Sequence, residues 1–122
     1  MQKSVKILLL LLLVIFSVTT YSVAEENKLP DLIPYRKGDK WGFCDKNKKI
    51  VVPCKYDLAH FFKEGLACVQ VKGKYGFVNK EGKEVIPLKY DSAWYFIEGF
   101  ASVQLNGKWG IIDTNGTEYW ED

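Results

Sequence analysis

The sequence has few of the residues from which catalytic and metal sites are usually built. Its 122 residues include one histidine, His60, and three cysteines. Structural zinc sites need clustered cysteine and histidine ligands at short spacings. Cys44, Cys54 and Cys68 contain no Cys-x-x-Cys pair, and no histidine lies beside a candidate nucleophile. We therefore expect no catalytic residue, no metal, no cofactor and no enzymatic activity.

Long hydrophobic runs are absent except near the N-terminus. Lys3 and Lys6 precede an apolar run that starts at Ile7, and Ser22-Val23-Ala24 supplies small residues of the kind found before a cleavage site. The run ends near Val18, so it is shorter than the roughly 20 residues that span a bilayer. An uncleaved membrane anchor is the alternative. We predict a signal peptide over residues 1–24, cleaved after Ala24, and a secreted or periplasmic protein that meets the membrane only during export.

The predicted mature chain also lacks an excess of either charge. The formal net charge of +2 comes from Lys3 and Lys6, because all fifteen acidic residues follow the leader. The other fifteen basic residues therefore balance the acidic ones. Nucleic-acid-binding proteins usually carry a basic patch or stripe, whereas the lysines here are dispersed through predicted turns. We expect no nucleic-acid partner.

What the chain does contain is an internal repeat of 34 residues. An aromatic residue followed by glycine recurs with that constant spacing at Trp41, Tyr75 and Trp109. A constant period of this length is typical of stacked supersecondary units. We expect an N-terminal linker over residues 25–31 and a single domain of three repeats, 32–65, 66–99 and 100–122.

Each repeat has the pattern of an antiparallel meander. In the second repeat, short β-branched runs lie near residues 66–71, 74–79 and 84–87. The two-residue loop Lys72-Gly73 between the first two runs is a hairpin signal. Pro87 cannot donate a ladder hydrogen bond, so we expect it to mark the end of the third strand or an exposed edge. The sequence thus predicts an all-β fold of tandem 34-residue repeats: three antiparallel three-stranded meanders joined by two aromatic-rich linkers, residues 54–65 and 88–99.

The linkers and the glycines suggest how these units pack. Asp57 and Asp91 are expected to cap local turns by accepting hydrogen bonds from amides just ahead of them. His60 corresponds to Trp94 one repeat later, which indicates an aromatic packing position rather than a general base. Each mid-strand glycine is expected to make room for an aromatic ring from a linker or a neighbouring unit.

These motifs resemble the WG-repeat family, also called KWG repeats. The family pattern of Gly-Lys-Trp-Gly, a hydrophobic pair with Asp, Gly-Lys, Val-Ile-Pro, Lys-Tyr-Asp and Glu-Gly-Leu-Ala is carried almost completely by residues 73–101, with Tyr75 in place of Trp. The first repeat departs from the pattern at Gly38-Asp39 and Lys48, and the third ends in Glu-Tyr-Trp-Glu. The resemblance implies a tandem β-repeat protein, commonly bacterial and often exported, with no established catalytic activity.

Two sets of residues are candidates for a site. Trp41, Tyr75 and Trp109 either form an aromatic binding surface or belong to the core beside their glycines. An odd number of cysteines permits at most one internal disulfide, for which Cys54 and Cys68 are the candidates. Buried free thiols are the alternative.

We expect an exported, non-catalytic repeat module that binds or scaffolds other proteins in the cell envelope or outside the cell. The alternative is binding of a glycan or peptidoglycan fragment through Trp41, Tyr75 and Trp109. The partner is therefore an unidentified protein or an envelope glycan. Self-association through uncapped terminal strands is a third possibility.

Overall fold

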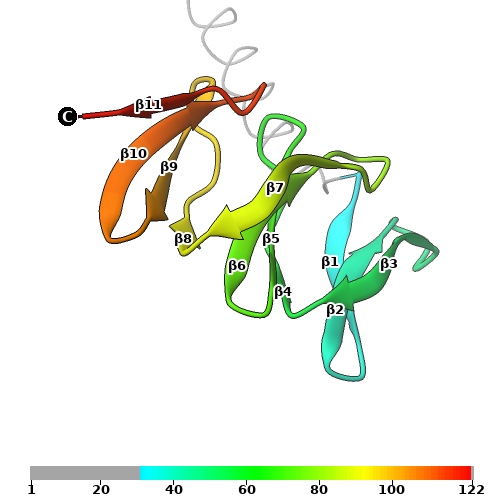
Figure 1. Ribbon diagram of the computed structural model, residues 1–122. Coiled ribbons are helices and arrows are strands. Elements are labelled where there is room, and N and C mark those ends of the chain that lie inside the picture. Colours follow the sequence, from blue (N-terminus) through cyan, green and yellow to red (C-terminus); the bar gives the residue numbers. More distant parts are fainter. Residues whose placement is uncertain (1–30, 122) are drawn as a thin grey trace, which may run out of the picture. The chain divides into compact units, whose positions relative to one another are not determined.

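The computed structural model describes residues 31–121. These residues form eleven strands and no helix. They form three antiparallel sheets that follow one another along the chain (Figure 1). Sheet 1 comprises β1 (Ile33–Lys37), β2 (Lys40–Cys44) and β3 (Ile50–Tyr56). Sheet 2 comprises β4 (Leu58–Ala59), β5 (Ala67–Val71), β6 (Lys74–Val78) and β7 (Glu84–Tyr90). Sheet 3 comprises β8 (Ser92–Ala93), β9 (Phe100–Leu105), β10 (Lys108–Asp113) and β11 (Glu118–Trp120).

This arrangement confirms the predicted all-β fold of tandem repeats. The predicted signal peptide and nearly all of the predicted N-terminal linker lie outside the described residues. Within residues 31–121, no helix of a length and hydrophobicity suited to crossing a membrane is found.

The number of strands differs from the prediction in two of the three sheets. Sheet 1 has the expected three strands, but sheets 2 and 3 each gain a fourth from the preceding linker. In sheet 2, Leu58 pairs with Gln70 and Ala59 with Val69. The added strand satisfies backbone groups of β5 that would otherwise form an open edge. The linkers are therefore partly strand, and each one ties two successive sheets together.

Of the two positions predicted for the proline, the end of the third strand and an exposed edge, the structure shows the second, because β3 and β7 are edge strands of their sheets and the prolines are exposed. Strands β3 and β7 continue through Pro53 and Pro87 to a tyrosine. A register shift makes this possible, because Phe77 pairs with Ile86 whereas Tyr75 pairs with Tyr90. The residues between Ile86 and Tyr90 thus bulge opposite Gly76, and the exposed proline lies in that bulge.

The bulge also explains two of the three mid-strand glycines. A Cβ on Gly42 would lie 2.3 Å from the carbonyl oxygen of Val52, and one on Gly76 would lie 2.6 Å from that of Ile86. These glycines make room for bulged backbone and not, as expected, for an aromatic ring. Only Gly110 lies against a ring, because a Cβ there would be 2.4 Å from the Trp120 indole. That tryptophan belongs to the same sheet, where β10 and β11 pair without the shift.

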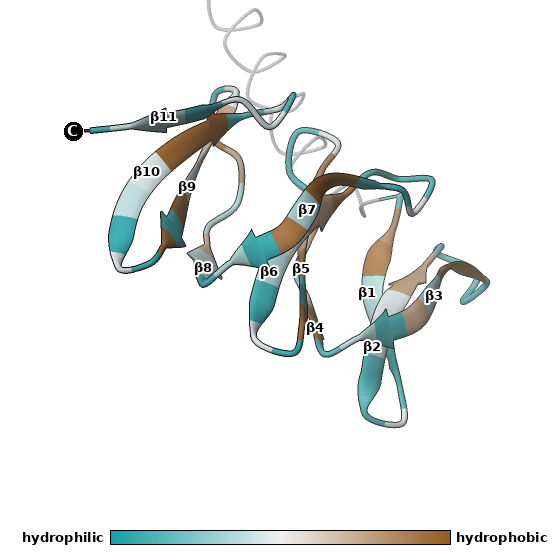
Figure 2. Ribbon diagram, in the orientation of Figure 1, coloured by the Kyte–Doolittle hydropathy of each residue, from teal (hydrophilic) through white to brown (hydrophobic). Residues whose placement is uncertain are grey.

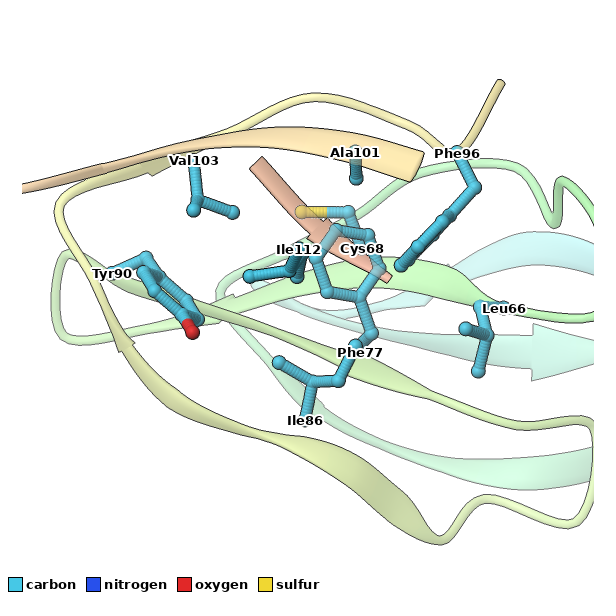
Figure 3. Packing of buried hydrophobic residues seen from close by; sticks show 9 residues of the cluster. All are labelled: Leu66, Cys68, Phe77, Ile86, Tyr90, Phe96, Ala101, Val103 and Ile112. Atoms are coloured by element: carbon cyan, nitrogen blue, oxygen red, sulfur yellow. The ribbon is translucent and has the colours of Figure 1, made fainter. Parts of the chain in front are cut away.

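Two apolar clusters hold successive sheets together. The forward face of sheet 2, formed by Leu66, Phe77 and Ile86, packs against Ala101, Val103 and Ile112 of sheet 3 (Figure 3). The back face of sheet 2, formed by Ala67, Val69 and Val78, packs against Leu32, Phe43 and Val52 of sheet 1. Both faces of the middle sheet are therefore buried, as the apolar residues on both faces of each meander predicted.

Candidate binding surface

The three predicted aromatic residues do not share one environment. Trp41 and Tyr75 are mostly buried and only partly accessible to solvent, whereas Trp109 is 50% exposed. Trp41 pairs with Tyr56 and Tyr75 pairs with Tyr90 across the sheet. The shorter β11 reaches only Gly110, so Trp109 has no equivalent tyrosine beside it. The structure therefore places these aromatics on three separate sheets and leaves only the last largely open to solvent.

All three cysteines lie within the described residues and all are free. The Cys54 thiol in sheet 1 donates a hydrogen bond of 3.5 Å to the backbone carbonyl oxygen of Tyr35. Cys68 lies in the cluster between sheets 2 and 3, so its side chain is on the side of sheet 2 that faces away from sheet 1. This orientation explains why the predicted Cys54–Cys68 bridge is absent. Burial raises the pKa of the Cys68 thiol to about 12, so it stays protonated at neutral pH.

A groove of about 450 Å³ lies between the bends of the two linkers. Phe61 from the first linker and Trp94 and Tyr95 from the second line it, and they are 57%, 60% and 47% exposed. His60 also lines this groove and is exposed. His60 and Trp94, predicted to be aromatic packing positions, therefore line the groove with exposed side chains.

The apolar surface continues from this groove across the outer face of sheet 3. A second hollow lies between Trp94 and Tyr95 on one side and Ile111 on the other, and a third begins at Ile111. Because neighbouring hollows share residues, the exposed apolar side chains form one continuous apolar strip. Its members are Phe61, Trp94, Tyr95, Ile97, Phe100, Trp109, Ile111 and Tyr119. Figure 2 shows that the hydrophobic colour reaches β9 and β10, whereas the hairpin tips are hydrophilic.

Sequence reasoning found only one member of the apolar strip, Trp109. In the second linker Phe96 is buried, with its ring centroid 4.9 Å from that of Phe77. The adjacent Trp94 and Tyr95 point to solvent instead. The sequence does contain a signal for the exposed residues, namely three consecutive aromatics at 94–96. Adjacent side chains of an extended segment point to different sides, so one linker cannot bury all three rings against the same sheet.

Two aspartates connect the units around this surface. Asp57 accepts a hydrogen bond from the Lys40 ammonium of sheet 1 and another, of 2.7 Å, from the backbone amide of Lys72 in sheet 2. Asp91 repeats the arrangement with the Lys74 ammonium and the Asn106 amide, the latter at 2.9 Å. The expected local caps are therefore long-range contacts that tie successive sheets. These lysine and amide donors lower the pKa of both carboxyls.

Further polar contacts reinforce the same junctions. The Glu64 carboxylate of the first linker accepts a hydrogen bond of 2.9 Å from the amide of Gly99 in the second. Glu118 of sheet 3 accepts from the Tyr90 hydroxyl at 3.0 Å and forms an ion pair with Lys89. The acidic residues thus position the sheets relative to one another. Within residues 31–121, no group of three or more His, Cys, Asp or Glu side chains is arranged to hold a metal ion.

Asp57 and Asp91, which each accept hydrogen bonds from two successive sheets and are named the aspartate clamps, lead to a prediction about how stability depends on pH. Because the folded-state pKa values of Asp57 and Asp91 are lowered, their stabilising effect is complete above the ordinary carboxyl pKa of about 4 and is lost as pH falls through the folded values. We expect the double variant Asp57→Asn, Asp91→Asn to be less stable at pH 7 and to lose less stability than wild type between neutral and acid pH. Urea unfolding at a series of pH values measures both.

Asp45→Asn is the matched control for this experiment. Asp45 accepts only from the amides of Asn47 and Lys49 in its own turn, and Asn79 makes the same contacts one repeat later. This control should be as stable as wild type at pH 7, because an amide oxygen accepts the same two hydrogen bonds at Asn79. An unchanged pH dependence in the double variant would show that the clamps do not contribute.

Comparison with known families places the repeat. Residues 41–75 and 75–109 each match the family model described as WG containing repeat. The two matches together span more than half of the chain, and each begins at the aromatic residue of an aromatic–Gly pair. Comparisons with curated proteins and with solved structures returned no match.

Proposed function

The chain belongs to the WG-containing repeat family, and from this premise we propose that it is an exported, non-catalytic module that binds another protein. The apolar strip is the observation that carries the proposal. Continuous exposed apolar patches of this kind mark interaction sites, and aromatic side chains are enriched in protein interfaces. The sheets beneath the strip are fixed to one another by the buried clusters and the aspartate clamps, so the surface is held in place before it meets a partner.

A protein partner suits this surface better than a sugar does. The strip combines aromatic rings with aliphatic side chains such as Ile97 and Ile111, which are 59% and 41% exposed. Burying aliphatic groups against apolar side chains of a partner is favourable, whereas sugar hydroxyls placed there would need polar partners. The glycan alternative requires Trp41 and Tyr75 to be accessible, and both are half-buried.

The proposal is tested by affinity capture with the immobilised chain from the envelope and the medium of the cells that make it. We expect a specific protein to be retained by wild type, and its affinity to fall roughly tenfold or more for Trp94→Ala or Phe61→Ala, as for interface hot spots. Val51→Ala is the matched control, because Val51 is 43% exposed but lies on β3, outside the apolar strip. It should retain the protein as wild type does.

Two results would contradict this proposal. One is that no protein is retained by wild type, and the other is that the same protein is retained equally by the Trp94→Ala, Phe61→Ala and Val51→Ala variants. Titration of the chain with soluble peptidoglycan fragments tests the alternative. Binding that is lost in Trp109→Ala would favour the glycan.

A further inference from the structure

The outer face of sheet 3 is equivalent, position by position, to surfaces that are buried elsewhere in the molecule. Ile111 pairs with Tyr119 as Phe77 pairs with Ile86 in sheet 2, and Phe100 occupies the repeat position of Leu66. In sheet 2, Leu66, Phe77 and Ile86 are 7%, 0% and 0% exposed. In sheet 3, Phe100, Ile111 and Tyr119 are 46%, 41% and 49% exposed. The difference arises because the following sheet covers the first set and none of the described residues covers the second.

Sheet 3 also has a lysine at the position that forms an ion pair in the other two sheets. Lys40 and Lys74 each form an ion pair with the aspartate of the linker that follows their sheet. Lys108 is the third residue of that series, and within residues 31–121 it forms no ion pair. Sheet 3 therefore presents both the apolar and the charged half of a repeat junction. A repeat that ends a stack needs a polar outer face, whereas the outer face of sheet 3, the last sheet of the described residues, is apolar.

Sheet 1 carries the complementary half. The back face that covers a forward face consists of Ala67, Val69 and Val78 in sheet 2, and the equivalent positions in sheet 1 are Ile33, Tyr35 and Cys44. Cys44 is only 1% exposed, whereas Ile33 and Tyr35 on the edge strand β1 are half-buried and are the part of this face that a partner can reach. The apolar parts of the two halves of one junction are thus present at opposite ends of the three sheets, whereas the sequence has Val23 and no aspartate at the position that precedes sheet 1 as Asp57 precedes sheet 2.

We propose that the outer face of sheet 3, which is equivalent to the forward face of sheet 2, binds the back face of sheet 1 in a second copy of this chain. The copies are then joined head to tail. The contact repeats the packing that already joins sheet 1 to sheet 2 and sheet 2 to sheet 3, so it continues an interface that the chain forms twice within itself. A head-to-tail contact uses two different surfaces and therefore builds a ring or an open filament of copies. The sheet 3 face is the end of the apolar strip that contains Phe100, Ile111 and Tyr119, whereas Phe61 lies at the other end of the strip, in the linker groove.

Sedimentation velocity on the chain as recovered from the cells that make it tests this proposal. Wild type should form larger species as concentration rises. Ser102→Arg places a charge at the centre of the sheet 3 face, where Ser102 is exposed, and Tyr35→Arg does the same on sheet 1. Each variant alone should be monomeric. An equimolar mixture should form a dimer and nothing larger, because each variant keeps one intact face. Phe61→Ala should assemble as wild type does.

Three outcomes would overturn the proposal: a wild type that stays monomeric at all concentrations, a Tyr35→Arg variant that assembles like wild type, and folded variants that do not associate when mixed. The second would indicate contact between two sheet 3 faces. Hydrogen–deuterium exchange of wild type is a measurement that needs no variant. Backbone protection in β1 and in β9–β10 should rise with concentration, and protection that is independent of concentration at both sites would also count against the proposal.

Discussion

Gly76→Ala is expected to destabilise the fold by about 3 kcal/mol or more, which is a large part of the stability of a small domain. The added Cβ would lie 2.6 Å from the carbonyl oxygen of Ile86 and 2.9 Å from the amide nitrogen of Leu88. Both obstacles are backbone atoms of the β7 bulge. They cannot move without breaking the pairing that sets Ile86 and Tyr90 in the core, because the bulge lies between those two residues.

Gly110→Ala is the matched comparison for this prediction. A Cβ at Gly110 would also be too close to its neighbours, at 2.4 Å, but the atoms it meets belong to the Trp120 side chain. Trp120 ends the three-residue strand β11 at the edge of sheet 3, so its ring can turn away. We expect a loss of about 1 to 2 kcal/mol there. Urea unfolding measures both variants, and a Gly76→Ala protein with stability equal to that of Gly110→Ala would refute the bulge explanation.

The repeat period and the hairpins could be predicted because they depend on local chemistry. Lys72 and Gly73 both have positive φ, at 50° and 80°, as the two-residue turn between β-branched runs indicated. The predicted departure of the first repeat is also present, since Lys48 adopts the positive φ that Gly82 has one repeat later. These features need only a few adjacent residues.

The bulge and the fourth strand depend on pairing partners that are far apart in the sequence. Proline in a strand is compatible with an end, an edge or a bulge, and only the opposing Gly76 decides among them. In the same way, Leu58 and Ala59 form a strand because β5 has an open edge beside them. Nothing in the short linker segment itself distinguishes this from a turn, so the sequence alone predicted a linker.

The binding surface could not be located from the repeat pattern, because equal positions in a repeat are not equally covered. Tyr75 and Trp109 occupy the same place in their hairpins, yet only Trp109 is half exposed. Their difference comes from the following sheet, which covers the forward face of sheet 2 but is not present beyond sheet 3 among the described residues. A period identifies residues with equivalent backbone surroundings. It does not tell which copies of them meet solvent.

Two adjacent residues of the second linker should respond in opposite ways to the same change. Phe96 is 2% exposed and contacts Phe77 in the cluster between sheets 2 and 3. Removing its ring would leave a cavity at a junction, so Phe96→Ala should cost about 3 to 5 kcal/mol. Tyr95 is 47% exposed, and Tyr95→Ala should change stability by no more than about 0.5 kcal/mol.

The two variants should also differ in how well they capture the partner protein, and here Tyr95→Ala should have the direct effect. Tyr95 lines the groove between the linkers, so Tyr95→Ala should remain folded and weaken capture of the partner protein. Phe96→Ala would lose capture only to the extent that it unfolds, and lowering the temperature, or adding an osmolyte that favours the folded state, should restore it. Thermal unfolding and capture, measured on the same two variants, distinguish these roles. A Tyr95→Ala protein that is folded and binds as wild type does would show that the aromatic ring at this position is outside the binding surface.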